Sequence, residues 1–190
     1  MVRALAIGLA ALGLAAPPAG ACCRGVHLMP HGRPITAGRD AWPPLAIGDS
    51  VMIPAARRLA RGGIEVDARE GRFMRSAIRI LATRRRRHRR PHVVVVGLGT
   101  NFPVTYAEIR RALKLLGPGR TLAFVTPFRS WRALDSSAIR RAARRHPHRV
   151  SIVDWAARAA GHPSWFWGDG THLRPSGARA YARLLLSAAR

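Results

Sequence analysis

Cysteine is almost absent from this chain, in which Cys22 and Cys23 are the only two. Adjacent cysteines rarely bridge each other and no third cysteine is present, so we expect a folded part without disulfides. The histidines, among them His27, His31 and His162, show no metal-ligand spacing, and we assign no metal and no cofactor. An apolar core must therefore hold the fold, and 190 residues with 48% hydrophobic content are sufficient for one.

The apolar run near the start covers only residues 4–16, which is too short to span a bilayer comfortably. Arg3 precedes this run, and Ala19-Gly20-Ala21 offers a small-x-small cleavage site after it, a pattern typical of a secretory leader. We therefore expect a signal peptide over residues 1–21 and a secreted, extracytoplasmic protein. Cys22 follows the cleavage site directly, so a lipid anchor on this cysteine is an alternative to cleavage alone.

Acidic residues and lysine are scarce. Nine Asp and Glu oppose 33 Lys and Arg, the formal net charge is +24, and Lys114 is the only lysine. The run from Arg84 to Arg90, interrupted only by His88, has the composition of a nucleic-acid-binding segment. Because the leader indicates export, we expect no nucleic acid partner. The run is interpreted as a solvated basic face, with contact to an anionic envelope polymer or membrane surface as the alternative.

Beyond residue 42, short apolar runs alternate with segments of helical pattern. Strands are predicted over 45–47, 64–67, 92–96, 121–125 and 150–153, with helices between them and a last helix after Pro175. Four consecutive valines from 93 to 96 indicate burial on both faces, as in a parallel sheet. We predict one α/β domain over 43–190, a three-layer α/β/α sandwich with a flavodoxin-like, doubly wound parallel sheet of about five strands. Residues 22–42 lack periodicity and are expected to form an irregular N-terminal linker or an irregular edge.

Three polar strings carry the chemistry: Gly48-Asp49-Ser50, Gly99-Thr100-Asn101 and Asp169-Gly170-Thr171-His172. The first two follow predicted strands, and ligands of doubly wound folds bind at the carboxyl ends of strands. Together the strings supply a serine nucleophile, an amide that can hold an anion, and a histidine base with a carboxylate three residues before it. Each string alone is explained more simply as a helix cap or a turn. Their combination favours acyl transfer on serine.

These strings resemble the SGNH hydrolase (GDSL-like) superfamily, and the resemblance extends over about residues 45–190. It implies that Ser50 is the nucleophile, that His172 is its base and that Asp169 orients the base. It also implies an oxyanion hole made by the N–H groups of Ser50 and Gly71 and by the Asn101 side chain. The strings are most similar to SGNH domains attached to membrane acyltransferases that O-acetylate cell-wall glycans.

Two departures from the family pattern are visible. Phe102 stands where many members have an aspartate, and Val51-Met52 replaces the leucine of the GDSL name. Trp165 and Trp167 precede the Asp169 turn, and two interpretations remain open for them: a platform for a sugar ring or acyl chain, or packing of the last loop against the core.

The resemblance implies a serine esterase or O-acyltransferase that forms an acyl-serine intermediate, and we expect a monomer. Its expected substrate is an acylated carbohydrate or a small ester with a short acyl group, acetyl in the first place, and a membrane acyltransferase is a candidate partner. The alternative is a non-catalytic, basic envelope-binding protein that keeps the same fold.

Overall fold

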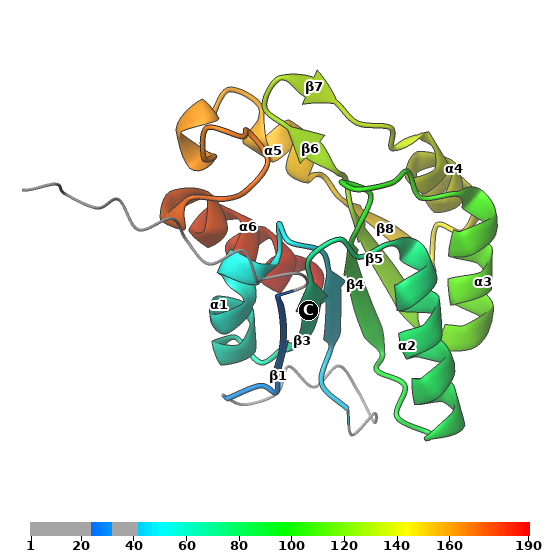
Figure 1. The fold of residues 1–190 in the computed structure, drawn as a ribbon. Helices are drawn as coiled ribbons and strands as arrows, with labels where there is room; N and C mark the ends of the chain where they lie inside the picture. Colours follow the sequence, from blue (N-terminus) through cyan, green and yellow to red (C-terminus); the bar gives the residue numbers. More distant parts are fainter. Residues whose placement is uncertain (1–23, 32–41) are drawn as a thin grey trace, which may run out of the picture.

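A six-stranded sheet forms the centre of the computed structural model, which describes residues 24–31 and 42–190 (Figure 1). The strand order is β1-β3-β2-β4-β5-β8; all neighbours are parallel except β1, which pairs antiparallel with β3. The five parallel strands, counted along the chain, lie in the order 2-1-3-4-5 of flavodoxin-like folds, so the predicted fold class is confirmed. The strands are β1 (Gly25–Leu28), β2 (Leu45–Gly48), β3 (Glu65–Arg69), β4 (Val93–Gly97), β5 (Thr121–Val125) and β8 (Val150–Val153).

Helices cover both faces of the sheet and make the three layers. One face packs against α1 (Ala56–Arg61), α5 (Trp155–Ala159) and α6 (Pro175–Ala188), and the other against α2 (Met74–Arg86), α3 (Tyr106–Leu116) and α4 (Ser137–Arg145) (Figure 1). The valine run of β4 shows why both faces are needed. Val93 and Val95 pack in the core on the side of α1, α5 and α6, which we call the first core. Val94 and Val96 pack in the second core, on the side of α2, α3 and α4, because alternate side chains of a strand point to opposite faces. Short elements complete the chain: η1 (Ile53–Ala55), η2 (Pro163–Trp165), and a hairpin of β6 (Phe128–Arg129) and β7 (Arg132–Ala133).

The segment 22–42 departs from the prediction. We expected a linker or an irregular edge, but its described part contains a regular edge strand, β1, whose Gly25 pairs with Arg69 of β3. Val26 and Leu28 pack against the first core, while the alternate residues face outward. A four-residue edge strand with two apolar side chains gives too weak a pattern to be predicted. The signal peptide predicted for 1–21 lies outside the described residues, and within them no helix combines the length and apolarity needed to cross a membrane.

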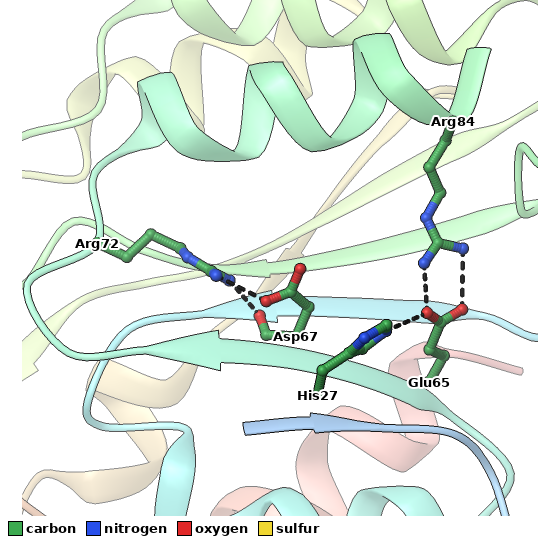
Figure 2. Close-up of polar contacts among 5 residues, drawn as sticks. All are labelled: His27, Glu65, Asp67, Arg72 and Arg84. Atoms are coloured by element: carbon green, nitrogen blue, oxygen red, sulfur yellow. Dashed lines mark hydrogen bonds and ion pairs between the residues drawn. The ribbon is translucent and has the colours of Figure 1, made fainter. Parts of the chain in front are cut away.

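A cluster of ion pairs fastens the sheet edge to α2 (Figure 2). Arg84 of α2 donates both terminal nitrogens to the Glu65 carboxylate at the start of β3, one of them at 2.8 Å, and His27 of β1 lies 2.6 Å from the same carboxylate. Two residues further along β3, Asp67 accepts from Arg72 at 2.6 Å. The Glu65 side chain is only 3% exposed; burial raises its pKa, but Arg84 and His27 outweigh burial and hold the pKa below its usual value.

Candidate active site

Ser50 lies in a tight turn at the carboxyl end of β2. The Asp49 N–H donates to the carbonyl of Gly97 at the end of β4, which fixes the turn against the neighbouring strand. A Cβ on Gly48 would come within 2.5 Å of the Met52 Cβ, so the glycine of this motif is required by the close return of the chain. The turn passes directly into η1, and the predicted position of Ser50 between strand and helix is confirmed.

His172 reaches this turn from the other end of the sequence. Its Nε2 lies 3.0 Å from the Ser50 Oγ, although 122 residues separate the two, and its Nδ1 pairs with the Asp169 Oδ2. The second carboxylate oxygen, Oδ1, accepts the backbone N–H groups of Thr171 and His172, both at 2.9 Å. Partial burial raises the pKa of Asp169, but His172 and these N–H groups outweigh it, so the pKa stays below its usual value and the carboxylate is ionised at neutral pH.

The turn that carries Asp169 and His172 is held on the β6–β7 side. The Ser130 N–H, between the two short strands, donates to the Gly170 carbonyl at 2.8 Å. Gly170 has φ of +55°, and a Cβ there would collide with the ring of Trp131. Because glycine has no side chain, the β6–β7 hairpin packs directly against this turn, and this contact fixes the position of His172.

Asn101 and the loop that carries Gly71 come together at the same edge of the sheet. Ser50, Gly71 and Asn101 follow β2, β3 and β4, three neighbouring strands. The Asn101 amide donates to the Arg72 carbonyl at 3.4 Å, which joins the two outer loops beside the Ser50 turn. Gly71 has φ of +65° and open space where a Cβ would be, so no side chain covers the backbone there. The structure thus brings the loops of Ser50, Gly71 and Asn101 to one edge of the sheet.

Asp49 is fully buried directly behind Ser50. Its Oδ1 accepts the Val51 N–H at 3.0 Å. Burial raises the pKa of this carboxyl to about 6, against the opposing effects of the Val51 N–H, Thr100 and His172. Tyr181 is buried nearby, and its pKa is raised by burial and by the charge of Asp49. The sequence interpretation of Asp49 as a helix cap did not anticipate a titratable group inside the core.

The structure separates the two tryptophans. Trp165 stacks on His162, with ring centres 4.0 Å apart, and on Trp155 at 5.8 Å, which favours the packing interpretation for this residue. Trp167 is 52% exposed, and the Arg174 guanidinium lies 4.8 Å from its ring centre. Sequence reasoning did not single out the exposed Phe73 or Trp131, although each lies near a recognised motif.

Several proteins of known structure or function are similar to this chain. The peptidoglycan O-acetyltransferase OatA of Listeria monocytogenes is 33% identical over 146 residues, which cover 75% of this chain. The solved C-terminal catalytic domain of Streptococcus pneumoniae OatA, which carries a methylsulfonyl adduct, matches with a TM-score of 0.66 and 26% identity over 78% of this chain and 92% of that domain. A protein from Slackia heliotrinireducens assigned to the SGNH hydrolases has the same fold, with a TM-score of 0.58 and 20% identity over 77% of this chain and 98% of that one.

The chain is similar to the catalytic domain of peptidoglycan O-acetyltransferases, and it has the fold of an SGNH hydrolase. No protein-family model matches it. The chain spans about a quarter of the length of the curated relatives it matches, 23% in the case of Listeria OatA. The similarity to these O-acetyltransferases thus concerns one SGNH domain of much longer proteins.

Proposed function

We propose that this SGNH domain is a serine enzyme that moves a short acyl group, acetyl in the first place, to or from a carbohydrate hydroxyl. The observation that carries the proposal is the relay from Asp169 through His172 to Ser50, with the histidine Nε2 3.0 Å from the serine oxygen. A base in contact with a hydroxyl at the open end of a strand, itself oriented by a carboxylate, is the arrangement that activates a nucleophile.

The proposed reaction has two halves. Ser50 Oγ attacks the ester carbonyl while His172 Nε2 accepts its proton, and Asp169 stabilises the imidazolium that forms. The N–H groups of Ser50 and Gly71 and the amide of Asn101 stabilise the oxyanion. Collapse of the tetrahedral intermediate breaks the ester bond, and His172 returns the proton to the departing alcohol. Water or a sugar hydroxyl then attacks the acyl-serine by the same steps in reverse.

The relatives support the acyl group and the type of substrate. Listeria OatA is a peptidoglycan O-acetyltransferase, and the proposal carries its acetyl group and glycan substrate to this chain. We place the domain outside the cytoplasmic membrane, as a monomer exported by the leader over 1–21, with lipid attachment at Cys22 as the alternative. A membrane acyltransferase is the proposed source of the acyl donor, because the chain is similar to a domain of peptidoglycan O-acetyltransferases.

Hydrolysis of p-nitrophenyl acetate tests the proposal. Replacing Ser50 by alanine should lower kcat by about 10³-fold or more, because attack then needs an unactivated water. Ser151→Ala, at an exposed position of β8, is the matched control and should retain the activity of the unaltered protein. Equal hydrolysis by the unaltered protein and Ser50→Ala would refute the mechanism.

The arginine-rich face suggests a second candidate function, the binding of an anionic polymer. A hollow of about 390 Å³ lies beside the ion-pair cluster of Figure 2, and Arg79, Arg87 and Arg89 on its lining are exposed. Arg84, by contrast, is paired with Glu65, so the arginine run is partly structural. Polyphosphate is a suitable probe: the double variant Arg87→Ala, Arg89→Ala should weaken salt-dependent binding more than substitutions elsewhere, and equal binding would refute this role.

A further inference from the structure

Exposed large apolar side chains gather around the candidate active site. Among the residues that the structure describes, the five exposed ones are Met29, Phe73, Phe102, Trp131 and Trp167. Four of them lie beside candidate site residues: Phe73 and Phe102 follow Gly71 and Asn101 in the chain, and Trp131 and Trp167 flank the Asp169 turn. Apolar side chains that remain exposed together at one edge indicate a surface that binds something.

Phe73 and Phe102 form a pair that bridges two loops. Their ring centres lie 5.3 Å apart with the rings nearly perpendicular, at 88°, in the edge-to-face arrangement that aromatic rings prefer. The hydrogen bond from Asn101 to the Arg72 carbonyl lies one residue before each ring in the chain and holds the same two loops together. The pair is therefore fixed relative to the proposed oxyanion hole. Phe102 is 67% exposed, so most of its ring surface is free for a ligand.

The pair lines a hollow of about 480 Å³ at the start of α2 and α3. This size falls within the range of small-ligand sites. Polar groups complete the wall: Arg75, Thr105 and Glu108 line it as well, and the capping box between Thr105 and Glu108 holds that part of the wall rigid. An aromatic surface bordered by a guanidinium and a carboxylate suits a sugar ring, whose C–H face stacks on the ring and whose hydroxyls need hydrogen-bond partners. A fatty acyl chain, by contrast, would make no hydrogen bond with the Arg75 guanidinium on this wall.

We propose that this hollow is a carbohydrate subsite in which a pyranose ring of the glycan stacks on Phe102. The edge-to-face contact with Phe73 holds the Phe102 ring in place. The inference rests on the proposed function, since it assigns the glycan that exchanges its acyl group at Ser50. It also gives a role to Phe102, which stands where many family members have an aspartate: the departure exchanges a charge for a stacking surface beside Asn101.

Calorimetric titration with a β-1,4-linked N-acetylglucosamine pentasaccharide tests the subsite. The Ser50→Ala protein is used as the parent, so that no turnover occurs. Adding Phe102→Ala should raise Kd by about three- to tenfold, the effect expected from the loss of one aromatic stacking contact. Phe102→Tyr should retain the affinity of the parent. Met29→Ala, which removes an exposed apolar side chain at the other end of β3, should also bind like the parent and is the matched control.

Three results would overturn the subsite: no saturable binding of the pentasaccharide to the parent, equal Kd with and without Phe102→Ala, or an equal loss in Met29→Ala. A series of p-nitrophenyl esters of increasing acyl length tests the alternative that the hollow holds an acyl chain. If Phe102→Ala abolishes a preference for octanoate over acetate and leaves sugar binding intact, the hollow holds an acyl chain and the inference is wrong. Inactivity of the unaltered protein on p-nitrophenyl acetate would count against the proposed function only, because the titration does not depend on turnover.

Discussion

Arg84 and Glu65 form an ion pair that is almost removed from solvent, with side chains 16% and 3% exposed. Replacing Arg84 by methionine retains an unbranched apolar stem and the helical propensity but removes the guanidinium, which leaves the buried Glu65 carboxylate with His27 beside it. Removing one partner of a buried pair typically costs about 3–5 kcal/mol, because the remaining charge is desolvated without compensation. Since His27 stays in contact, we expect the lower end, about 3 kcal/mol.

The pKa of Glu65 decides how the cost of Arg84→Met in stability should change with pH. The pKa of Glu65 in the folded protein lies below the ordinary value of 4.5, so the paired carboxylate stabilises the fold above pH 4.5, and this contribution is lost as the pH falls through the folded pKa. In Arg84→Met the effect of burial is no longer outweighed, and the Glu65 pKa rises. Protonation of Glu65 then removes the buried charge that lacks its partner. The stability difference between the two proteins should be largest at neutral pH and shrink below about pH 4.5.

Urea denaturation followed by circular dichroism at several pH values measures both effects. Arg86→Met is the matched control. Arg86 lies in the same turn of α2, is exposed and donates a hydrogen bond to the Thr83 hydroxyl, so the loss should stay below about 0.5 kcal/mol. The reasoning is refuted if Arg84→Met costs no more than Arg86→Met, or if its cost does not change between pH 7 and pH 4.

Two further predictions concern carboxyl groups near Ser50. Burial raises the pKa of Asp49 from 3.8 to about 6, so the stability that the protonated carboxyl contributes is full below pH 3.8 and is lost as the pH rises through 6. The free energy of unfolding of Asp49→Asn, measured by urea denaturation, should therefore rise by about 3 kcal/mol relative to that of the unaltered protein between pH 4 and pH 7. A difference that does not change with pH would contradict the burial argument. Asp169→Asn should lower kcat on p-nitrophenyl acetate by about 10²–10⁴-fold, because an amide no longer fixes the histidine tautomer, while the melting temperature stays nearly unchanged at this half-exposed position. Full activity of Asp169→Asn would show that the carboxylate does not orient the base.

The parallel core and its strand-end motifs could be predicted because their signals are local. Four valines in a row allow little besides a strand buried on both faces, and the predicted strand over 121–125 matches β5 residue for residue. The end of helix α2 has no such signal: the helix continues to Arg86 through the arginine run, and its last turn contains Arg84, which binds Glu65.

Features that depend on pairing in space could not be predicted. Nothing local in the sequence announces that Glu65 and Arg84 meet, or that Phe73 and Phe102 form one surface from two loops. The two tryptophans carried the same signal, and only the packing of Trp165 on Trp155 distinguishes them. Strand β1 was not predicted because its four residues form a strand only through their pairing with β3, which the local sequence does not reveal.

Covalent modification of Ser50 tests the central claim most directly. Methanesulfonyl fluoride reacts with an activated serine, and a related S. pneumoniae domain carries a methylsulfonyl adduct. Intact-mass and peptide mass spectrometry of the folded protein should show one sulfonyl group on Ser50, no modification in Ser50→Ala, and much slower modification in His172→Ala. An unmodified Ser50 in the folded protein, or equal rates with and without His172, would contradict the assignment of this serine as an activated nucleophile.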